Sequence, residues 1–553
     1  MNRIFALLFA AAAGSISAQS SLKVVPAWTH HTNAAPPNNR AAHVAAFEAT
    51  PVVARGLLYV ITPFDQVLAL DPGTGEERWR FDPEIAKDRD YSEASARGVA
   101  VSEDTVLFGT LDARLVALRT GDGKRVWDVP IAPGVADGNF QITSPPVVVG
   151  QTVIVGSAIG DNGRAEMERG VVRAFDLRTG NRKWSWDPTP EGKTGAANAW
   201  SLLTADRDRD VVFVPTGSAS PDFFGGLRPG DNHYANSVAA LRASTGRLLW
   251  SFQVVHHDLW DYDAASAPVL VNFKGKPAVA VLTKMGHYFV LDRENGKPLL
   301  PVEERPVPHS DVPGELASAT QPFPVSGRFT EQKFVPRPGW CEERAAKLRY
   351  EGIFTPPSVR GTLVFPGNVG GANWGGGSYD AQRGLIFTAA NRLATEVRLI
   401  PREAFDRSGH GDTGERLGLE YGSQAGAPFA MSRRTFTGPD GRPCNQEPWG
   451  ALDAIDVESG KLRWENPITV SLGGPLSVNG LVFFGGTLFE SKFRAYAADT
   501  GKQLFETDLP FTANSTPGTY EWHGKRYIVL SAGGHGKVDG SKLGDLVMAF
   551  TVE

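Results

Sequence analysis

One eleven-residue phrase recurs along the chain. It reads ALDPGTGEERW at residues 69–79, ALRTGDGKRVW at 117–127 and AFDLRTGNRKW at 174–184. It returns as ALRASTGRLLW at 240–250, AIDVESGKLRW at 454–464 and, with a final phenylalanine, AYAADTGKQLF at 495–505, while VLDRENGKPLL at 290–300 is a weaker copy. Each copy joins an apolar strand end to a turn containing glycine, and a second strand then ends on an aromatic residue in all but the weakest copy.

The sequence before most copies predicts another strand. Apolar stretches such as GLLYVITP (56–63), QTVIVGS (151–157) and GLVFFGG (480–486) stand there. Each unit is then a small antiparallel sheet, and stacking such sheets around an axis buries their faces. Residues 19–553, divided into units of roughly 65 residues, give about eight units. We therefore predict an all-β fold, one eight-bladed β-propeller domain of four-stranded antiparallel blades over 19–553. A linear β-solenoid is the alternative, and its repeats would be shorter and more uniform.

The long gap between the copies at 290–300 and 454–464 must hold a further blade. GTLVFPGN (361–368) and LIFTAANRL (385–393) are its predicted strands. Segments 301–350 and 401–448 are rich in proline, glycine and charge, which predicts long loops. Loops of that length in a compact domain are usually lids or surface additions.

Composition and the N-terminus limit the class of protein. The net charge of −5 offers no basic field for nucleic acid. The first 18 residues, MNRIFALLFAAAAGSISA, have a basic start, an apolar run and small residues at the end, which predicts a signal peptide over 1–18 and a periplasmic location. Past it, no run of 18 apolar residues predicts a membrane span. Cys341 and Cys444 fit a disulfide bond or two buried thiols equally well.

The stretch HHDLWDYD, residues 256–263, places three carboxylates beside two large aromatic residues. It fits a metal site, a catalytic base in an apolar pocket, or a polar corner of the repeat. The repeated tryptophans themselves are predicted to be structural. Residues outside the repeat fall at similar places in successive units, and equivalent propeller loops converge on one end of the channel. They are therefore expected to build a single pocket.

Four longer strings carry a resemblance to a known family. They are TGRLLWSFQVVHHDLWDYD (245–263), TKMGHYFVLDRENG (283–296), YEGIFTPPSVRGTLVFPGNVGGANWGG (350–376) and GKRYIVLSAGGHG (524–536). With them the chain resembles the dehydrogenases that use pyrroloquinoline quinone (PQQ), in particular the propeller domain of membrane-bound glucose and quinate dehydrogenases. The resemblance extends over nearly all of residues 19–553.

The resemblance implies a role for each matching residue. Asp261 would be the catalytic base for the substrate hydroxyl, with Lys284 as the cation beside the quinone oxygens and Trp200 as the surface on which the cofactor stacks. Other implied cofactor contacts are Glu48, Arg97, Thr143, Asn373 and Trp374. The implied metal is calcium or another divalent cation, held by Asp161, Asn162 and Asp261. Glu166 or Glu168 is an alternative ligand, in the manner of the alcohol-type enzymes.

The sequence also departs from the family pattern. Glu93 stands where glucose-type enzymes have a histidine, and Ser218 stands where alcohol-type enzymes have an asparagine ligand. No membrane anchor or haem segment is recognised, so a separate electron acceptor, a cytochrome c or a membrane quinone, is expected. We therefore predict a periplasmic quinoprotein dehydrogenase for a small polyol, cyclic alcohol or sugar. The alternatives are a non-catalytic propeller scaffold of the outer-membrane assembly type and a degenerate quinoprotein.

Overall fold

The computed structural model describes residues 22–34, 44–89, 91–132, 139–189, 194–412, 419–487, 490–537 and 543–553. The predicted signal peptide, 1–18, lies outside these residues. The described chain is built of strands, with two short helices, α1 (Trp340–Ala345) and α2 (Arg402–Ser408). Strand pairing is antiparallel except between β2 (Ala45–Ala46) and β7 (Ala94–Ser95). The prediction of an all-β fold is confirmed.

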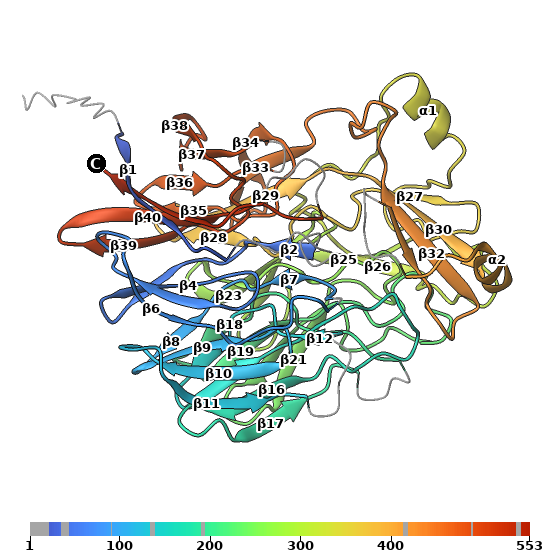
Figure 1. Cartoon of the computed structure of the whole chain (residues 1–553). Helices are drawn as coiled ribbons and strands as arrows, with labels where there is room; N and C mark the ends of the chain where they lie inside the picture. Colours follow the sequence, from blue (N-terminus) through green and yellow to red (C-terminus); the bar gives the residue numbers. More distant parts are fainter. Residues whose placement is uncertain are drawn as a thin grey trace, which may run out of the picture.

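Consecutive strands form sheets of four, or in one case three, antiparallel strands (Figure 1). Their strands are β3–β6 (Val52–Ala54, Leu57–Ile61, Val67–Leu70, Glu77–Phe81); β8–β11 (Ala100–Ser102, Thr105–Gly109, Arg114–Arg119, Arg125–Pro130); β13, β14, β16 and β17 (Val147–Val149, Thr152–Val155, Val172–Asp176, Arg182–Trp186); β18–β21 (Thr204–Asp206, Val211–Pro215, Ser237–Arg242, Leu248–Gln253); β22–β24 (Val269–Phe273, Lys276–Leu282, Tyr288–Asp292); β28, β29, β33 and β34 (Gly377–Asp380, Leu385–Asn391, Gly450–Asp456, Leu462–Ile468); β35–β38 (Leu476–Val478, Leu481–Phe484, Lys492–Ala497, Gln503–Asp508); and β39–β41 with β1 (Gly518–Trp522, Lys525–Ala532, Leu546–Val552, Val24–His31). The repeated four-stranded unit is as predicted, and the number of eight blades stays a prediction.

The two ends of the chain share one sheet. Strand β1 pairs with β41 along its length, from Val24 opposite Val552 to His31 opposite Leu546. In Figure 1 the blue N-terminal strand accordingly lies beside the red C-terminal strand. The first strand therefore completes the last sheet and ties the two ends of the described chain together.

The repeated tryptophans join neighbouring sheets, which confirms their structural interpretation. Trp127 donates its indole N–H to the carbonyl of Leu177 in the next repeat, at 3.0 Å. The ring covers Gly180, whose φ of 70° lies in the left-handed region and where a Cβ would approach the indole to 3.0 Å. Trp184 makes the same bond to Ala243, at 2.9 Å. The glycine and the aromatic position of the phrase therefore serve one contact between successive sheets.

The predicted long loops contain regular structure, so that part of the prediction was wrong. Segment 301–350 holds a hairpin, β25 (Val302–Pro306) with β26 (Thr320–Pro324), and helix α1. Segment 401–448 contributes α2, β31 (Leu419–Gly422) and β32 (Phe429–Thr435). The last two strands join β27 (Thr362–Val364) and β30 (Thr395–Pro401) in an additional sheet, in the order β27-β30-β32-β31. We call it the side sheet; it lies at the right of Figure 1, beside α2.

The side sheet also corrects the assignment of GTLVFPGN. Its strand β27 belongs to the side sheet, whereas LIFTAANRL forms β29 of a repeated sheet, as predicted. One face of the side sheet is apolar, and Val397, Leu399 and Met431 pack into the same buried cluster as Phe223 and Phe224. Burial of these side chains explains why the segment folds rather than remaining a loop.

Two further features fix the segments around the site. A disulfide bond joins Cys341 in α1 to Cys444, which resolves the alternative left open by the sequence. Short ladders, β2 with β7 and β12 (Phe140–Gln141) with β15 (Ala158–Ile159), precede the loops that carry Glu48 and Asp161.

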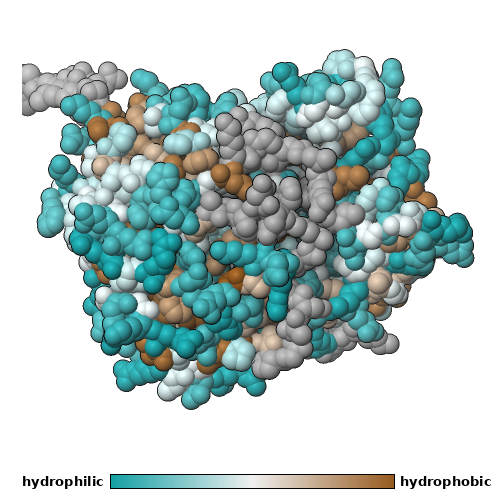
Figure 2. Space-filling view, viewed as in Figure 1, coloured by the Kyte–Doolittle hydropathy of each residue, from teal (hydrophilic) through white to brown (hydrophobic). Residues whose placement is uncertain are grey.

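None of the helices in the described residues is long and apolar enough to cross a membrane. The face seen in Figure 2 is mostly hydrophilic, with hydrophobic residues in small groups.

Candidate active site

Loops from most of the repeated sheets converge on one cavity of about 580 Å³. Its wall carries many charged side chains, the acids Glu93, Asp161, Asp261, Asp263, Asp412 and Glu420 and the bases Arg89, Arg97, Lys284, Arg433, His535 and Lys537. The predicted residues that line it are Arg97, Asp161, Asn162, Trp200, Asp261, Lys284, Asn373 and Trp374. Two predicted contacts, Glu48 and Thr143, are buried behind the wall and do not line the cavity.

The aromatic residues of HHDLWDYD anchor the turn that presents its acids. Trp260 and Tyr262 are almost fully buried and donate hydrogen bonds to the carbonyls of Thr355 (2.8 Å) and Pro366 (2.5 Å). Asp258 accepts the backbone N–H groups of both aromatic residues. Between them, Asp261 has a φ of 60°, an uncommon value for a residue with a side chain. The turn is therefore held from both sides in a conformation that directs Asp261 to the cavity.

The two histidines of the stretch are not part of the cavity wall. His257 is buried and contacts Gly230 and Glu315, while His256 contacts Gln253 and Glu304. The stretch therefore combines two of its three interpretations: Asp258 and the histidines form a polar corner, and Asp261 and Asp263 face the pocket.

Asp261 and Asp263 share one cation. The Nζ of Lys284 lies 2.8 Å from Asp261 Oδ1 and 2.9 Å from Asp263 Oδ2, and it also donates to the Asp261 carbonyl. Burial raises the pKa of Asp261 to about 6, against the opposing effect of Lys284. Burial also acts on Asp263, but Lys284 and hydrogen bonds from Ser218 and Trp200 outweigh it and lower the pKa. Asp261 is thus the more basic of the two carboxylates, as a general base requires.

One residue of the side sheet, Arg433, contacts the same carboxylate, and a second, Glu420, holds Arg433; neither was predicted from the sequence. Arg433 of β32 donates to Asp261 Oδ2 at 2.5 Å and to Glu420 Oε2 at 2.7 Å. Glu420 lies on β31 directly opposite Arg433 in the strand register. Both lie in the segment that was predicted to be a loop, where no periodic pattern marks individual positions.

The predicted metal ligands lie beside an excess of negative charge. Burial and repulsion from Asp261 and Asp263 raise the pKa of Asp161 to about 7. Asn162 donates to the buried carboxylate of Asp222 at 3.1 Å. Asn162 Oδ1 and Asp222 Oδ1 are buried and lack a hydrogen-bond partner among the described residues. These oxygens and the mutual repulsion of the carboxylates suit a divalent cation.

The alternative ligand positions do not fit as well. Ser218 is buried away from the cavity wall, where its N–H and hydroxyl bond Asp263 and its hydroxyl bonds Asp258. Glu166 and Glu168 do not line the cavity either. Glu168 accepts a hydrogen bond from Arg164. Ser218 thus holds Asp263 by hydrogen bonds and does not face the cavity as a metal ligand would.

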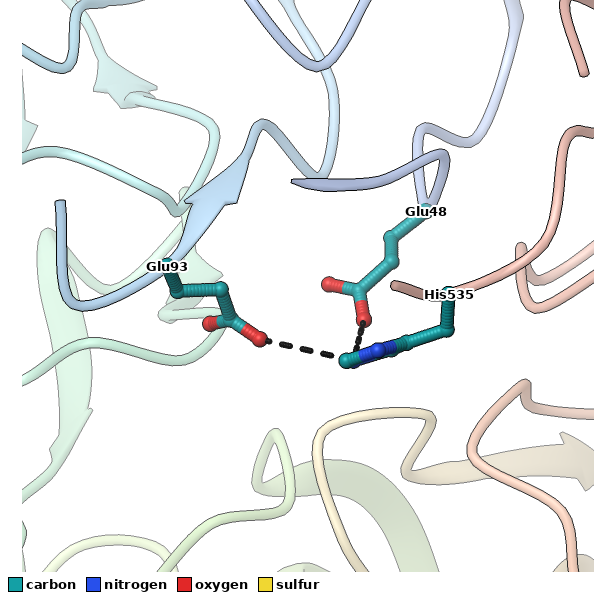
Figure 3. Close-up of side chains that lie close together, drawn as sticks. All are labelled: Glu48, Glu93 and His535. Carbon is teal, nitrogen blue, oxygen red and sulfur yellow. Dashed lines mark ion pairs between the residues drawn. The ribbon is translucent and has the colours of Figure 1, made fainter. Parts of the chain in front are cut away.

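A second charged group, which includes Glu93, Arg97 and His535, also lines the cavity, and we call this part the Arg97 end; Figure 3 draws three of its side chains. Within the described part of the chain, Glu48, Glu93 and His535 form the one trio of acid or histidine residues whose ligand atoms lie within 4.8 Å of one another. Arg97 already pairs with both acids, at 2.9 Å from each. Although burial opposes ionisation, Arg97 and His535 hold the pKa of Glu93 well below its usual range. The guanidinium therefore supplies the positive charge here.

Arg97 also lies against two indoles. Its guanidinium carbon is 5.0 Å from the Trp200 ring and 5.1 Å from the Trp374 ring. Its Nε and Nη1 are buried and have no hydrogen-bond partner in the part of the chain that the structure describes. Thr143 supports this wall from behind, since it donates to the Trp200 carbonyl at 3.0 Å. Two indoles and two available N–H groups suit a flat, anionic ligand.

Comparisons with known proteins define the class. Residues 11–528 match the family model described as the glucose/ethanol/alcohol dehydrogenase beta-propeller domain, of PQQ type. The chain therefore belongs to this family of quinoprotein dehydrogenases, and the predicted resemblance is confirmed. The family description also confirms the propeller type of fold.

Individual relatives are similar over most of their length. The chain is 34% identical to quinoprotein glucose dehydrogenase A of Acinetobacter calcoaceticus, over 95% of this chain and 75% of the relative. It is 31% identical to the quinate/shikimate dehydrogenase (quinone) of Acinetobacter baylyi, over 91% and 72%. Among solved structures, the quinohemoprotein alcohol dehydrogenase of Comamonas testosteroni superimposes with a TM-score of 0.72 at 25% identity, over 96% of this chain and 76% of that one. The family acts on alcohol- and sugar-type substrates.

Proposed function

We propose that the protein is a periplasmic dehydrogenase that oxidises the hydroxyl group of a polyol, cyclic alcohol or sugar with bound PQQ, on an eight-bladed propeller. One observation carries the proposal: Asp261, with a pKa raised to about 6, faces the cavity beside Lys284 and between the two indoles and the acid-rich end. A carboxylate of this pKa is ionised at neutral pH and is still basic enough to take a proton.

The residues of the chain divide the work of the reaction. Asp261 takes the proton of the substrate hydroxyl on a carboxylate oxygen as the carbonyl forms. Bound PQQ supplies the quinone that accepts the hydride from the same carbon. Lys284 holds Asp261 in place through its 2.8 Å bond and presents positive charge to this end of the cavity. Asp263 keeps Lys284 charged and oriented from the other side, at 2.9 Å.

The site fits PQQ in shape and charge. Trp200 and Trp374 offer flat apolar surfaces for the fused rings. The two available N–H groups of Arg97 suit the carboxylates of the cofactor. Glu48 and Thr143 would support cofactor binding indirectly, because Glu48 pairs with Arg97 and Thr143 bonds the Trp200 backbone. Asn373 lines the cavity beside Trp374 and accepts its backbone N–H, which fixes that loop.

Calcium, or another divalent cation, would be held by Asp161, Asn162 and Asp261. Support comes from the raised pKa of Asp161 and from the buried Asn162 Oδ1. A cation there would relieve the repulsion among the acids. The export signal predicted at 1–18 and the Cys341–Cys444 bond support a periplasmic location. Electrons would pass to a separate acceptor, a cytochrome c or a membrane quinone.

The deciding experiment is a turnover assay on protein loaded with PQQ and calcium. Dye reduction is followed with sorbitol, glycerol, quinate and glucose as substrates. Reduction that requires both PQQ and the metal supports the proposal. No reduction with any hydroxyl substrate, at saturating PQQ and calcium, would favour the degenerate quinoprotein that the departures at Glu93 and Ser218 first suggested.

A further inference from the structure

Arg433 is the cation of the cavity that comes from the side sheet and touches the proposed base. Its Nη1 lies 2.5 Å from Asp261 Oδ2, and its Nε lies 2.7 Å from Glu420 Oε2. Its guanidinium carbon also lies 5.7 Å from the Phe223 ring. The side chains of Arg433, Asp261 and Glu420 are 15, 13 and 12% exposed, and all three line the cavity. A substrate that reaches Asp261 therefore meets Arg433.

Both oxygens of Asp261 accept hydrogen bonds from cations. Oδ1 accepts from Lys284 and Oδ2 from Arg433. Each oxygen keeps a second lone pair, but a substrate hydroxyl that binds there shares the oxygen with a cation, and it binds Asp261 best when one cation moves away. Lys284 is 4% exposed and is held by three oxygens, whereas the Arg433 side chain keeps more exposure and is anchored by a neighbouring strand. Arg433 is therefore the donor that the substrate can displace.

A neutral hydroxyl is a poor replacement partner for Arg433. Its bond to Asp261 is charge-assisted, and such bonds are roughly twice as strong as neutral ones. A carboxylate on the substrate restores a partner of the same charge and matches the planar guanidinium, which binds carboxylates in a bidentate manner. The exchange then leaves Oδ2 of Asp261 open to the substrate hydroxyl.

We propose that Arg433 recognises a carboxylate on the substrate, and that the protein oxidises hydroxy-carboxylates in preference to neutral alcohols. This inference rests on the proposed dehydrogenase function and names its substrate class. The hydroxyl proton goes to Asp261, the hydride from the carbinol carbon goes to the quinone, and the carboxylate is unchanged. The product is the corresponding oxo-carboxylate.

The test compares substrates that differ in charge. Quinate is paired with methyl quinate, and gluconate with sorbitol, and kcat/KM is measured on protein loaded with PQQ and calcium. We expect the wild type to prefer each carboxylate about 10- to 100-fold, the range that one charged hydrogen bond supplies. In Arg433→Gln this ratio should fall towards one, and in Arg433→Lys it should fall only in part, since charge is kept but the bidentate geometry is lost.

Arg434→Gln is the matched control. Arg434 is the next residue on β32, is 44% exposed and pairs with Glu396, away from Asp261. Its substrate preference should equal that of the wild type. A second readout needs no turnover: calorimetry of quinate and methyl quinate with the calcium-loaded protein lacking PQQ, in the wild type and in Arg433→Lys. Tighter binding of quinate, weakened in the variant, supports the inference.

The outcomes separate the inference from the proposed function. Equal kcat/KM for both members of each pair, or a preference that persists in Arg433→Gln, would overturn the role of Arg433 while the dehydrogenase stands. Equal binding of quinate and methyl quinate by the wild type would do the same, even if a variant failed to fold. Absence of turnover with these four compounds and also with glycerol and glucose would overturn the dehydrogenase itself.

Discussion

The two ends of the cavity both bury acids against cations, yet they call for opposite ligands. At the Asp261 end, Asp161, Asp261 and Asp263 lie near Lys284 and Arg433, and burial, together with repulsion among the acids, raises the pKa values of Asp161 and Asp261. At the Arg97 end, Glu48 and Glu93 share one guanidinium, and burial raises the pKa of Glu48. There the buried atoms without a hydrogen-bond partner among the described residues are Nε and Nη1 of Arg97 and both carboxylate oxygens of Glu48.

This difference leads us to weigh the charge balance of each group, and not proximity alone, when proposing where a metal ion binds. Glu48, Glu93 and His535 are the tighter group, but Arg97 already lies 2.9 Å from both acids. The aspartates are farther apart, but they keep a negative surplus and an orphan amide oxygen at Asn162. We therefore propose the cation at the Asp261 end and the anionic cofactor at the Arg97 end.

The largest expected effect follows removal of the base. Asp261→Asn should lower kcat by about 10³- to 10⁴-fold, because the amide cannot take the hydroxyl proton. PQQ affinity should change much less, since the cofactor depends on the other end. Dye reduction and a PQQ titration measure the two quantities. A variant that kept a tenth of the wild-type kcat would show that another group is the base.

The next largest effect is expected on calcium affinity, which should depend on the acids at the Asp261 end and not on those at the Arg97 end. Asp161→Asn should weaken calcium binding about 10- to 100-fold, because one charged ligand is lost. Glu93→Gln is the matched change at the other end and should leave calcium affinity within a few-fold. Calorimetry on metal-free protein measures both. Weaker calcium binding in Glu93→Gln than in Asp161→Asn would place the cation at the trio drawn in Figure 3 and contradict the proposed difference between the two ends.

A smaller effect is expected on the binding of PQQ, the anion proposed for the Arg97 end. Arg97→Lys should weaken PQQ binding about tenfold, because lysine keeps the charge but loses the planar, multidentate guanidinium. The calcium affinity of Arg97→Lys should equal that of the wild type. Quenching of tryptophan fluorescence reports PQQ binding, since Trp200 and Trp374 line the cavity. An equal loss of calcium affinity would mean that the two ends do not act independently.

The smallest effect is the pH dependence of stability in metal-free protein. The pKa values of Asp161 (about 7) and Asp261 (about 6) exceed the unfolded value of about 3.9, so the folded state binds more protons between about pH 4 and 7. These two groups therefore destabilise the fold as pH rises through that window. Urea unfolding at pH 5 and pH 8 should show a smaller fall in Asp161→Asn than in the wild type. Saturating calcium should abolish the difference, and a wild-type fall equal to that of the variant would contradict the account.

Sequence reasoning succeeded where a pattern repeats. The eleven-residue phrase predicted the strands, the turns and the structural tryptophans, because each copy forms the same contact to the next sheet. The strings that contain Asp261, Lys284 and Trp374 predicted residues that line one cavity. The same reasoning missed the side sheet, since Val397 and Met431 are buried against a core that only the folded chain creates. It missed Arg433 for the same reason: the contact of Arg433 with Asp261 joins residues 172 positions apart in the sequence.

The central claim is that one cavity takes PQQ at its Arg97 end and a divalent cation at its Asp261 end. The most direct measurement is a PQQ titration of metal-free protein, with and without calcium, followed by tryptophan fluorescence. The account predicts saturable quenching that calcium strengthens and that Trp200→Ala diminishes. Absence of quenching at micromolar PQQ, with calcium present, would contradict it.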